Sequence, residues 1–245
     1  MVGRLAFYET SADFSATIEA LFKSGEFNWR LGRYEIAETY YIDLLTNIDA
    51  SFGKKHEKYA EALNDLATVY LAQERFSLAE QTCQQAIDID DLAENKTNPA
   101  FAAHLNNFGV IFKAQCKYDE AERAYKKALK IDKLTIGENN QSFAIHLNNL
   151  AAMYLAQEKY VQAEELFLRV VEIDQITLPK DHPDAASGLN NLARVYIEQG
   201  KYSAASPLLE RALGIFTDRL PAGHRNIKKV QEKLQTCRAA LAGVE

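Results

Sequence analysis

The chain has 245 residues, of which 47% are hydrophobic and 25% charged, the composition of an ordinary folded protein and not of a disordered one. A formal net charge of −6 argues against a general nucleic-acid-binding protein, because such proteins need a basic surface for phosphates. No apolar run approaches the roughly 20 residues that cross a bilayer, and residues 1–9 lack the apolar stretch of a secretory signal.

The three cysteines, Cys83, Cys116 and Cys237, lie far apart and include no Cys-x-x-Cys pair. An odd number of widely spaced cysteines predicts free thiols rather than a disulfide framework or a zinc site. Free thiols are typical of a reducing compartment. We therefore expect a cytoplasmic protein that neither inserts into a membrane nor binds nucleic acid.

An internal repeat of 42 residues runs through most of the chain. Its most regular segment is Leu-Asn-Asp/Asn-Leu/Phe-Ala/Gly, which begins at Leu63, Leu105, Leu147 and Leu189. An aromatic residue and, three positions later, an alanine recur with the same spacing, the aromatics being Tyr34, Phe76, Tyr118, Tyr160 and Tyr202. Fixed periods of this length are typical of stacked supersecondary units. We expect five repeats in residues 15–223, after an N-terminal extension of residues 1–14.

The first of these repeats is degenerate. Ser24 and Asn28 stand where later repeats carry apolar residues, and Trp29 lies beside them. A repeat stack needs a terminal unit with a polar outer face. The first helix is suited to that position.

Each later repeat is predicted to form two helices, as the second repeat illustrates. Leu63, Leu66, Ala67 and Tyr70 fall at i, i+3, i+4 and i+7, the spacing of a helix with one buried face. A similar stripe of the second helix starts at Phe76 and contains several small residues. We expect the small residues of both helices to lie where helices nearly touch, namely Ala67, Ala79, Gly109, Ala121, Ala151, Ala163, Ala193 and Ala205.

The ends of the helices are marked with the same period. Residues that punctuate the repeats recur every 42 positions, at His56, Asn98, Asn140, His182 and His224, and Asn98-Pro99 and His182-Pro183 are expected to start helices because proline suits the first helical position. In the turn between the two helices of a repeat, Gly200 is suited to a left-handed cap. Cys116 and Glu158 occupy that place in other repeats, so we expect that a positive φ is not required there.

A single helix is predicted at the C-terminal end, in residues 224–245. Its apolar stripe runs from Ile227 to Leu241. The charged residues around the stripe are Lys228, Lys229, Glu232, Lys233 and Arg238. This pattern is typical of a capping helix whose back faces solvent, so the full prediction is ten repeat helices, one cap and almost no strand.

The repeated positions resemble the tetratricopeptide consensus, and the 42-residue period with Leu-Asn-Asn-Leu-Ala resembles its kinesin-light-chain type. The segments 182–184, 199–202 and 207–213 strengthen the resemblance. It implies an all-α, right-handed superhelical solenoid of tetratricopeptide-type helix pairs with a C-terminal capping helix. It also implies an adaptor or scaffold that binds a protein or peptide in a concave groove. The chain lacks the long heptad segment with which a light chain would bind a kinesin heavy chain.

The side of each first helix opposite its core stripe would line that groove. Its positions include Glu26 in the first repeat and Thr68 and Ala72 in the second. From this register we predict a peptide-binding set of Glu61, Asp65, Asn107, Val110, Asn149, Ala152, Asn191 and Arg194. Asparagine amides can bond the backbone of an extended peptide, whereas Asn106, Asn148 and Asn190 are expected to bond within the stack. Acidic residues dominate the N-terminal end of the groove, and Arg194 marks the other.

The sequence gives little reason to expect catalysis, a cofactor or a metal. His104 and His146 are equivalent positions a whole repeat apart, too distant to share a zinc ion, and a surface or capping role is expected for all five histidines. Asp88, Asp90 and Asp91 lie at a helix end without the glycine and glutamate of a calcium-binding loop, so they are expected to face solvent. Two alternatives to the adaptor stay open: a structural protein that self-associates into a homo-oligomer, and a regulatory subunit of an enzyme whose catalysis lies elsewhere.

Overall fold

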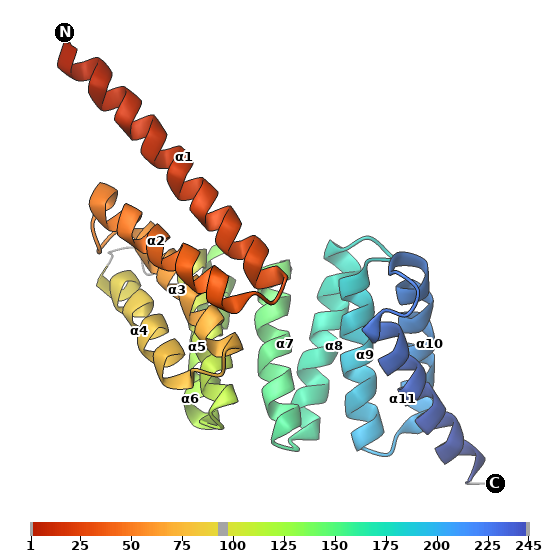
Figure 1. Ribbon diagram of the computed structural model, residues 1–245. Helices are drawn as coiled ribbons and strands as arrows, with labels where there is room; N and C mark the ends of the chain where they lie inside the picture. Colours follow the sequence, from red (N-terminus) through yellow and green to blue (C-terminus); the bar gives the residue numbers. More distant parts are fainter. Residues whose placement is uncertain (1, 93–97, 244–245) are drawn as a thin grey trace. The chain divides into compact units, whose positions relative to one another are not determined.

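A computed structural model describes the backbone of residues 2–92 and 98–243, and side chains from residue 15 onward within those ranges. In these ranges it contains eleven helices and no strand (Figure 1). The prediction of an all-α chain built from consecutive helix pairs is thereby confirmed. The helices form two compact units, residues 1–131 and 132–245, which are described in turn.

Unit 1 contains five complete helices and the greater part of a sixth. They are α1 (Val2–Arg30), α2 (Tyr34–Phe52), α3 (Glu57–Ala72), α4 (Phe76–Leu92), α5 (Pro99–Ala114) and α6 (Tyr118–Thr135), the last of which contains the boundary between the units. Neighbouring helices along the chain pack together from α1 to α5. The extension predicted for residues 1–14 falls within α1, and its side chains lie outside the described part.

Unit 2 contains α7 (Gln141–Ala156), α8 (Tyr160–Thr177), α9 (Pro183–Glu198), α10 (Tyr202–Arg219) and α11 (Arg225–Ala242). Here too each helix packs on the next along the chain. The stripe from Ile227 to Cys237 of α11 joins the core formed by α9 and α10. The division into an extension, five repeats and a cap stays a proposal, although the helix bounds follow the period closely.

Small residues at fixed positions allow the two helices of each repeat to approach closely. The seven alanines predicted at helix contacts have no exposed surface, and Gly109 is buried as well. In two repeats the small residue is a glycine that faces a tyrosine of the second helix. Tyr41 packs against Gly25, and Tyr125 packs against Gly109. The prediction of close helix contacts at these positions is therefore confirmed.

Helix ends follow the period through their hydrogen bonds. At the start of α3, the His56 side chain accepts from the backbone N–H of Lys58, and the same cap recurs at Asn98, Asn140, His182 and His224. These caps satisfy one of the N–H groups that a helix start leaves without a partner. The helix starts predicted at Asn98-Pro99 and His182-Pro183 are confirmed, and His56, His182 and His224 take the capping role that was one of the two expected for them.

The expectation for the turns was wrong. Glu74, Cys116 and Glu158 have φ angles of 59°, 58° and 59°, in the same left-handed region as Gly200 at 73°. The cause is a backbone hydrogen bond that closes each turn, such as that from Lys201 N–H to the carbonyl of Tyr196 at 2.8 Å. This hydrogen bond joins residues five positions apart. It requires a left-handed backbone conformation just past the end of the helix, whichever residue occupies that position.

A glutamate in the second helix of one repeat binds two residues of the next repeat's turn. Glu80 accepts from Gln115 Nε2 and Lys117 Nζ, both at 2.8 Å, and Glu164 accepts from Gln199 and Lys201 at 2.9 and 3.1 Å. Glu38 makes the same contacts with Gln73 and Arg75. The signal was present in the sequence, because Glu38, Glu80, Glu122 and Glu164 share the period, as do the glutamines.

Two buried histidines pair with buried aspartates. His104 Nδ1 lies 2.6 Å from Asp90 Oδ2, and His146 Nδ1 lies 2.6 Å from Asp132 Oδ2. The expectation that Asp90 faces solvent and that these histidines lie at the surface was therefore wrong. Burial lowers the pKa of His146 and raises that of Asp132, because each loses hydration of its charged form. Because each aspartate has a histidine as its partner, both side chains can be buried where the second helix of one repeat packs against the first helix of the next.

Candidate functional site

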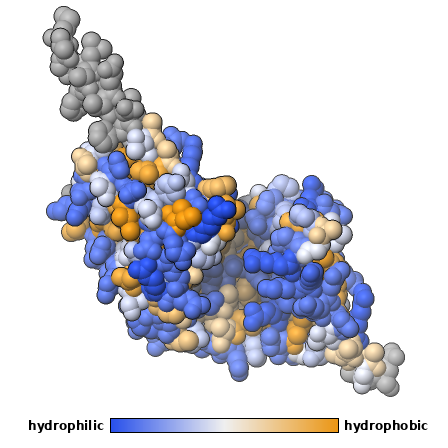
Figure 2. Space-filling view, viewed as in Figure 1, coloured by the Kyte–Doolittle hydropathy of each residue, from blue (hydrophilic) through white to orange (hydrophobic). Residues whose placement is uncertain are grey.

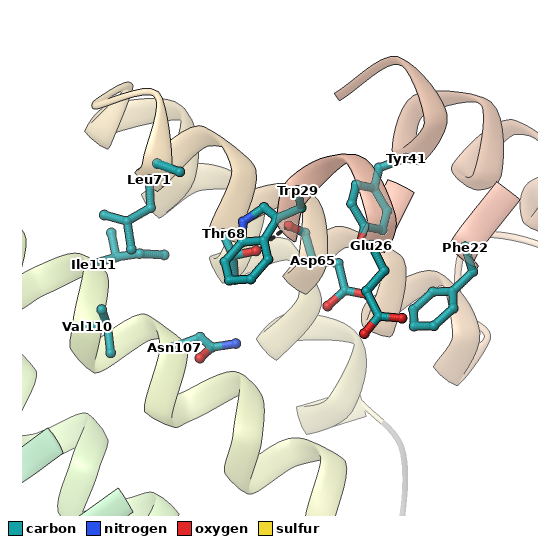
Figure 3. Close-up of a pocket in the computed structure, with 11 residues that line it drawn as sticks. Phe22, Glu26, Trp29, Tyr41, Asp65, Thr68, Leu71, Asn107, Val110 and Ile111 are labelled. Carbon is teal, nitrogen blue, oxygen red and sulfur yellow. Dashed lines mark hydrogen bonds between the residues drawn. The ribbon is translucent and has the colours of Figure 1, made fainter. Parts of the chain in front are cut away.

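A pocket of about 500 Å³ opens on unit 1 and is lined from α1, α2, α3 and α5 (Figure 3). We refer to it as the unit 1 pocket. Its lining residues are Phe22, Glu26, Trp29, Tyr41, Asp65, Thr68, Leu71, Ala72, Asn107, Val110 and Ile111. The volume is within the range of sites that hold small ligands or single side chains, about 300–1,000 Å³.

The repeat register brings these residues together. Asp65 on α3 and Asn107 on α5 are equivalent positions, as are Thr68 and Val110, so each first helix turns the same face to the pocket. The structure thus gathers three of the predicted binding residues, Asp65, Asn107 and Val110. Glu61 lies instead on a neighbouring hollow of about 310 Å³.

Aromatic side chains of α1 border the pocket. Trp29 and Phe22 are 41% and 40% exposed, so both rings offer apolar surface beside the pocket. Figure 3 shows the carboxyl groups of Glu26 and Asp65 between these two rings. Several apolar surface areas of unit 1 in Figure 2 lie over α1 and α2, and exposed apolar residues there include Phe27, Leu31, Ile36 and Ile42.

The pocket gathers acidic side chains. The pKa of Asp65 is raised to about 7, chiefly by burial and also by the carboxylates of Glu61 and Glu26, while His104 and a hydrogen bond with Asn64 oppose the rise. The pKa of the Tyr41 hydroxyl is also raised, by burial and by the carboxylates of Asp65 and Glu26. These mutual effects require Tyr41, Asp65 and Glu26 to lie close together. Among the described side chains, no lysine or arginine forms an ion pair with Asp65.

The asparagines of the repeat join neighbouring first helices within each unit. Asn107 Nδ2 donates to Asn64 Oδ1 at 3.0 Å in unit 1, and Asn191 Nδ2 donates to Asn148 Oδ1 at 2.9 Å in unit 2. The expected bonding of Asn148 within the stack is confirmed. Ligand contact by Asn107 and Asn191 stays a prediction, and the structure adds that an amide N–H of each is engaged by the preceding repeat.

Sequence profiles of the tetratricopeptide repeat match residues 16–91, 106–175 and 142–218, well over half of the chain. The chain belongs to the tetratricopeptide-repeat family. Such repeats generally mediate protein–protein interactions. No curated protein sequence matches the chain.

Solved structures show that this tetratricopeptide-repeat protein has the fold of the kinesin-light-chain type. BtubC (BKLC) from P. vanneervenii is 23% identical, with a TM-score of 0.75 over 91% of this chain and 89% of that one. A Podosopora anserina protein described as a kinesin light chain with nearly identical TPR-like repeats is 21% identical, with a TM-score of 0.68 over 82% of this chain and 95% of that one. At these identities the likeness concerns the fold alone.

The remaining predicted site residues of the tetratricopeptide-repeat protein lie in unit 2. Asn149 and Ala152 are half-buried on α7, and Arg194 is exposed on α9. Asn191 lines a small hollow of about 170 Å³ with Ile145 and Ser187. The structure does not bring these residues into one pocket comparable to that of unit 1.

A basic cluster on unit 2 was missed by the sequence analysis. Lys233 on α11 is half-buried and donates from Nζ to Asn190 Oδ1 at 2.8 Å, confirming the stack role expected for Asn190. Burial and the nearby charges of Arg194 and Lys229 lower the pKa of Lys233 to about 8. The expectation that the charges of the cap face solvent was wrong for Lys233, which takes the place that asparagine holds in earlier repeats.

In the described part of the chain, no helix is long and apolar enough to cross a membrane. The same residues contain no group of three or more histidine, cysteine or carboxylate side chains placed to hold a metal ion.

Proposed function

We propose that the protein is an adaptor that binds an extended segment of a partner protein on the face formed by its first helices. The unit 1 pocket is the main anchor point, and Asn149, Ala152, Asn191 and Arg194 form a separate contact surface on unit 2. The role is one of recognition without catalysis. Its place is the cytoplasm, which agrees with the free Cys83, Cys116 and Cys237.

The observation that carries this proposal is the composition of the unit 1 pocket. Positions selected by register alone, Asp65, Asn107 and Val110, line a cavity together with the exposed ring of Trp29. Interface hot spots are enriched in tryptophan and tyrosine and lie in pockets that a partner can close off from water.

Photo-crosslinking tests this proposal directly. A benzophenone amino acid replaces Val110 in the pocket or, as the control, Leu78, which is 38% exposed on α4 and lines no part of the pocket. In a cell extract, the probe at position 110 should label a defined segment of a partner, identified by mass spectrometry, while the probe at 78 should not. A purified partner should then lose affinity for the Trp29→Ala variant and keep its affinity for the Leu78→Ala variant.

Other outcomes would favour the alternatives. Labelling of a second copy of this chain from position 110, with a dimer or larger species in sedimentation, would favour self-association. A labelled partner that is an enzyme, whose rate changes when the chain binds, would favour a regulatory subunit. Labelling from position 78 alone would place the binding surface outside the pocket.

A further inference from the structure

We propose that the unit 1 pocket receives an arginine side chain of the partner, with its guanidinium between the carboxylates of Asp65 and Glu26 and against the ring of Trp29. This inference rests on the proposed function and specifies the chemistry of the ligand. It predicts a partner segment with an arginine at its anchor position.

Acidic side chains gather in the pocket, and of the two that line it Glu26 contacts a cation of its own helix, Arg30. Glu26 and Asp65 both line the pocket, and Glu61 is close enough to raise the pKa of Asp65. Like charges in a partly dehydrated space oppose one another, and a cation placed between them removes this repulsion. Among the described side chains no lysine or arginine forms an ion pair with Asp65, so the Asp65 side of the pocket is complementary to a cationic ligand.

The aromatic rings select the kind of cation. A guanidinium is planar and weakly hydrated, stacks on aromatic faces and binds carboxylates through a fork of N–H donors. The chain already places a guanidinium over an aromatic ring, with Arg75 Cζ 4.5 Å from the Tyr70 ring centre. Trp29 and Phe22 offer such faces at the pocket, and Trp gives the strongest cation–π interaction. A lysine would satisfy the charge but not the paired carboxylates and the ring together.

Glu26 already binds a guanidinium of its own helix. Arg30 Nη2 lies 2.5 Å from Glu26 Oε1, and the two side chains are 69% and 41% exposed. An exposed ion pair four residues apart on a helix contributes little to stability, because water screens it and two long side chains must be held in one geometry. A partner arginine, held by Asp65 and Trp29 as well, can therefore displace Arg30 from Glu26.

The chain carries a reporter for the experiment, because Trp29 is its single tryptophan. The probes are capped tripeptides Ala-Arg-Ala, Ala-citrulline-Ala and Ala-Lys-Ala, titrated against the full chain while Trp29 fluorescence and calorimetric heat are recorded. The arginine peptide should bind saturably. Citrulline, which has nearly the same shape without the charge, should bind at least about tenfold more weakly, as expected for loss of charged hydrogen bonds. The lysine peptide should fall between the two.

Variants separate the pocket from general charge. Asp65→Asn should weaken the arginine peptide about tenfold or more, Glu26→Gln should weaken it less, and Arg30→Gln should strengthen it about two- to fivefold by removing the competitor. Asp43→Asn, an exposed carboxylate of α2 outside the pocket, is the matched control and should leave affinity unchanged. If Asp65→Asn does not fold, as judged by circular dichroism, Glu26→Gln and Arg30→Gln still decide.

Equal binding of the arginine and citrulline peptides would overturn the inference. So would no saturable binding of the arginine peptide, or equal losses in Asp65→Asn and Asp43→Asn. These results leave the proposed function standing if Trp29→Ala still loses the partner found by crosslinking. Failure of the proposed function would show itself separately, as labelling that avoids position 110.

Discussion

Gly109 faces the ring of Tyr125 so closely that a Cβ at position 109 would lie 2.6 Å from Tyr125 Cε1. Real contacts of this kind do not occur at that distance, so the glycine and the tyrosine fit only as a pair. The equivalent pair at Ala151 combines a slightly larger residue with Phe167, both buried. The small residue of the first helix and the large residue of the second are therefore matched within each repeat.

Replacing this glycine should destabilise the protein. Gly109→Ala gains helix propensity, worth about 1 kcal/mol, but overpacks the contact with Tyr125, at a cost of about 1–3 kcal/mol. We expect a lower urea midpoint, and expect Tyr125→Leu to rescue part of the loss. The control is Gly214→Ala on α10, where an added Cβ meets nothing within 4 Å, so this change should stabilise by roughly 0.5–1 kcal/mol. A Gly109→Ala variant as stable as the parent would mean that α5 and α6 are not this close in solution.

Substitutions at two equivalent turn positions should change stability in opposite directions. Glu158 has a φ of 59° and Gly200 one of 73°. A left-handed residue other than glycine costs roughly 1–2 kcal/mol, partly offset by the greater freedom of glycine in the unfolded chain. We expect Glu158→Gly to raise stability by about 0.5–1 kcal/mol and Gly200→Ala to lower it by a similar amount, in urea denaturation. Changes of the same sign in both variants would contradict the shared turn geometry.

The turns also show where sequence reasoning has its limits. Apolar spacing predicted the helices, and the period together with Pro99 and Pro183 predicted where helices start. The positive φ of Cys116 was not predictable from that residue, because the closing backbone hydrogen bond sets it. The burial of Asp90 was missed since its partner, His104, follows in the next helix and pairing is a tertiary property. The periodic glutamates, by contrast, were visible in the sequence.

The candidate site divides in a similar way. Register placed Asp65, Asn107 and Val110 on one face, because equivalent positions of stacked helices point the same way. The contributions of Phe22 and Trp29 were not predicted, since the degenerate first repeat departs from the pattern on which the register rests. Lys233 was expected to face solvent because the capping helix was considered by itself. Its position, 42 residues after Asn191, is the one that asparagine occupies in earlier repeats.

The carboxyl of Asp65 should make stability depend on pH. Its pKa is raised from 3.8 to about 7, by burial and by Glu61 and Glu26, with His104 opposing. Between about pH 4 and 7 the folded chain therefore holds a proton that the unfolded chain releases, so this group's contribution to the unfolding free energy falls as pH rises through that window. Asp65→Asn removes this effect and should be more stable than the parent at pH 8, by about 1–3 kcal/mol, with a smaller difference at pH 5. Urea denaturation at both pH values measures this, and a difference independent of pH would contradict it.

The last prediction concerns Lys233, which stands where Asn107 and Asn191 stand in their repeats. Its Nζ donates to Asn190 Oδ1 at 2.8 Å, but burial, Arg194 and Lys229 lower its pKa to about 8, so its charge is disfavoured in the folded state at pH 7. Lys233→Asn should restore the neutral amide pair found elsewhere in the stack and raise stability by about 1–3 kcal/mol at low salt.

Part of that gain comes from relief of like-charge repulsion, which salt screens over about 8–10 Å. The stability difference between Lys233→Asn and the parent should therefore shrink when sodium chloride is raised from low concentration to 0.5 M, because the Debye length shortens as salt is added. Lys228→Asn, at an exposed position of the same helix, is the matched control and should change stability by less than about 0.5 kcal/mol. If Lys233→Asn is instead less stable than the parent at low salt, the contact with Asn190 favours lysine over asparagine. Lys233, Arg194 and Lys229 would then lie too far apart for the repulsion that lowers the pKa of Lys233.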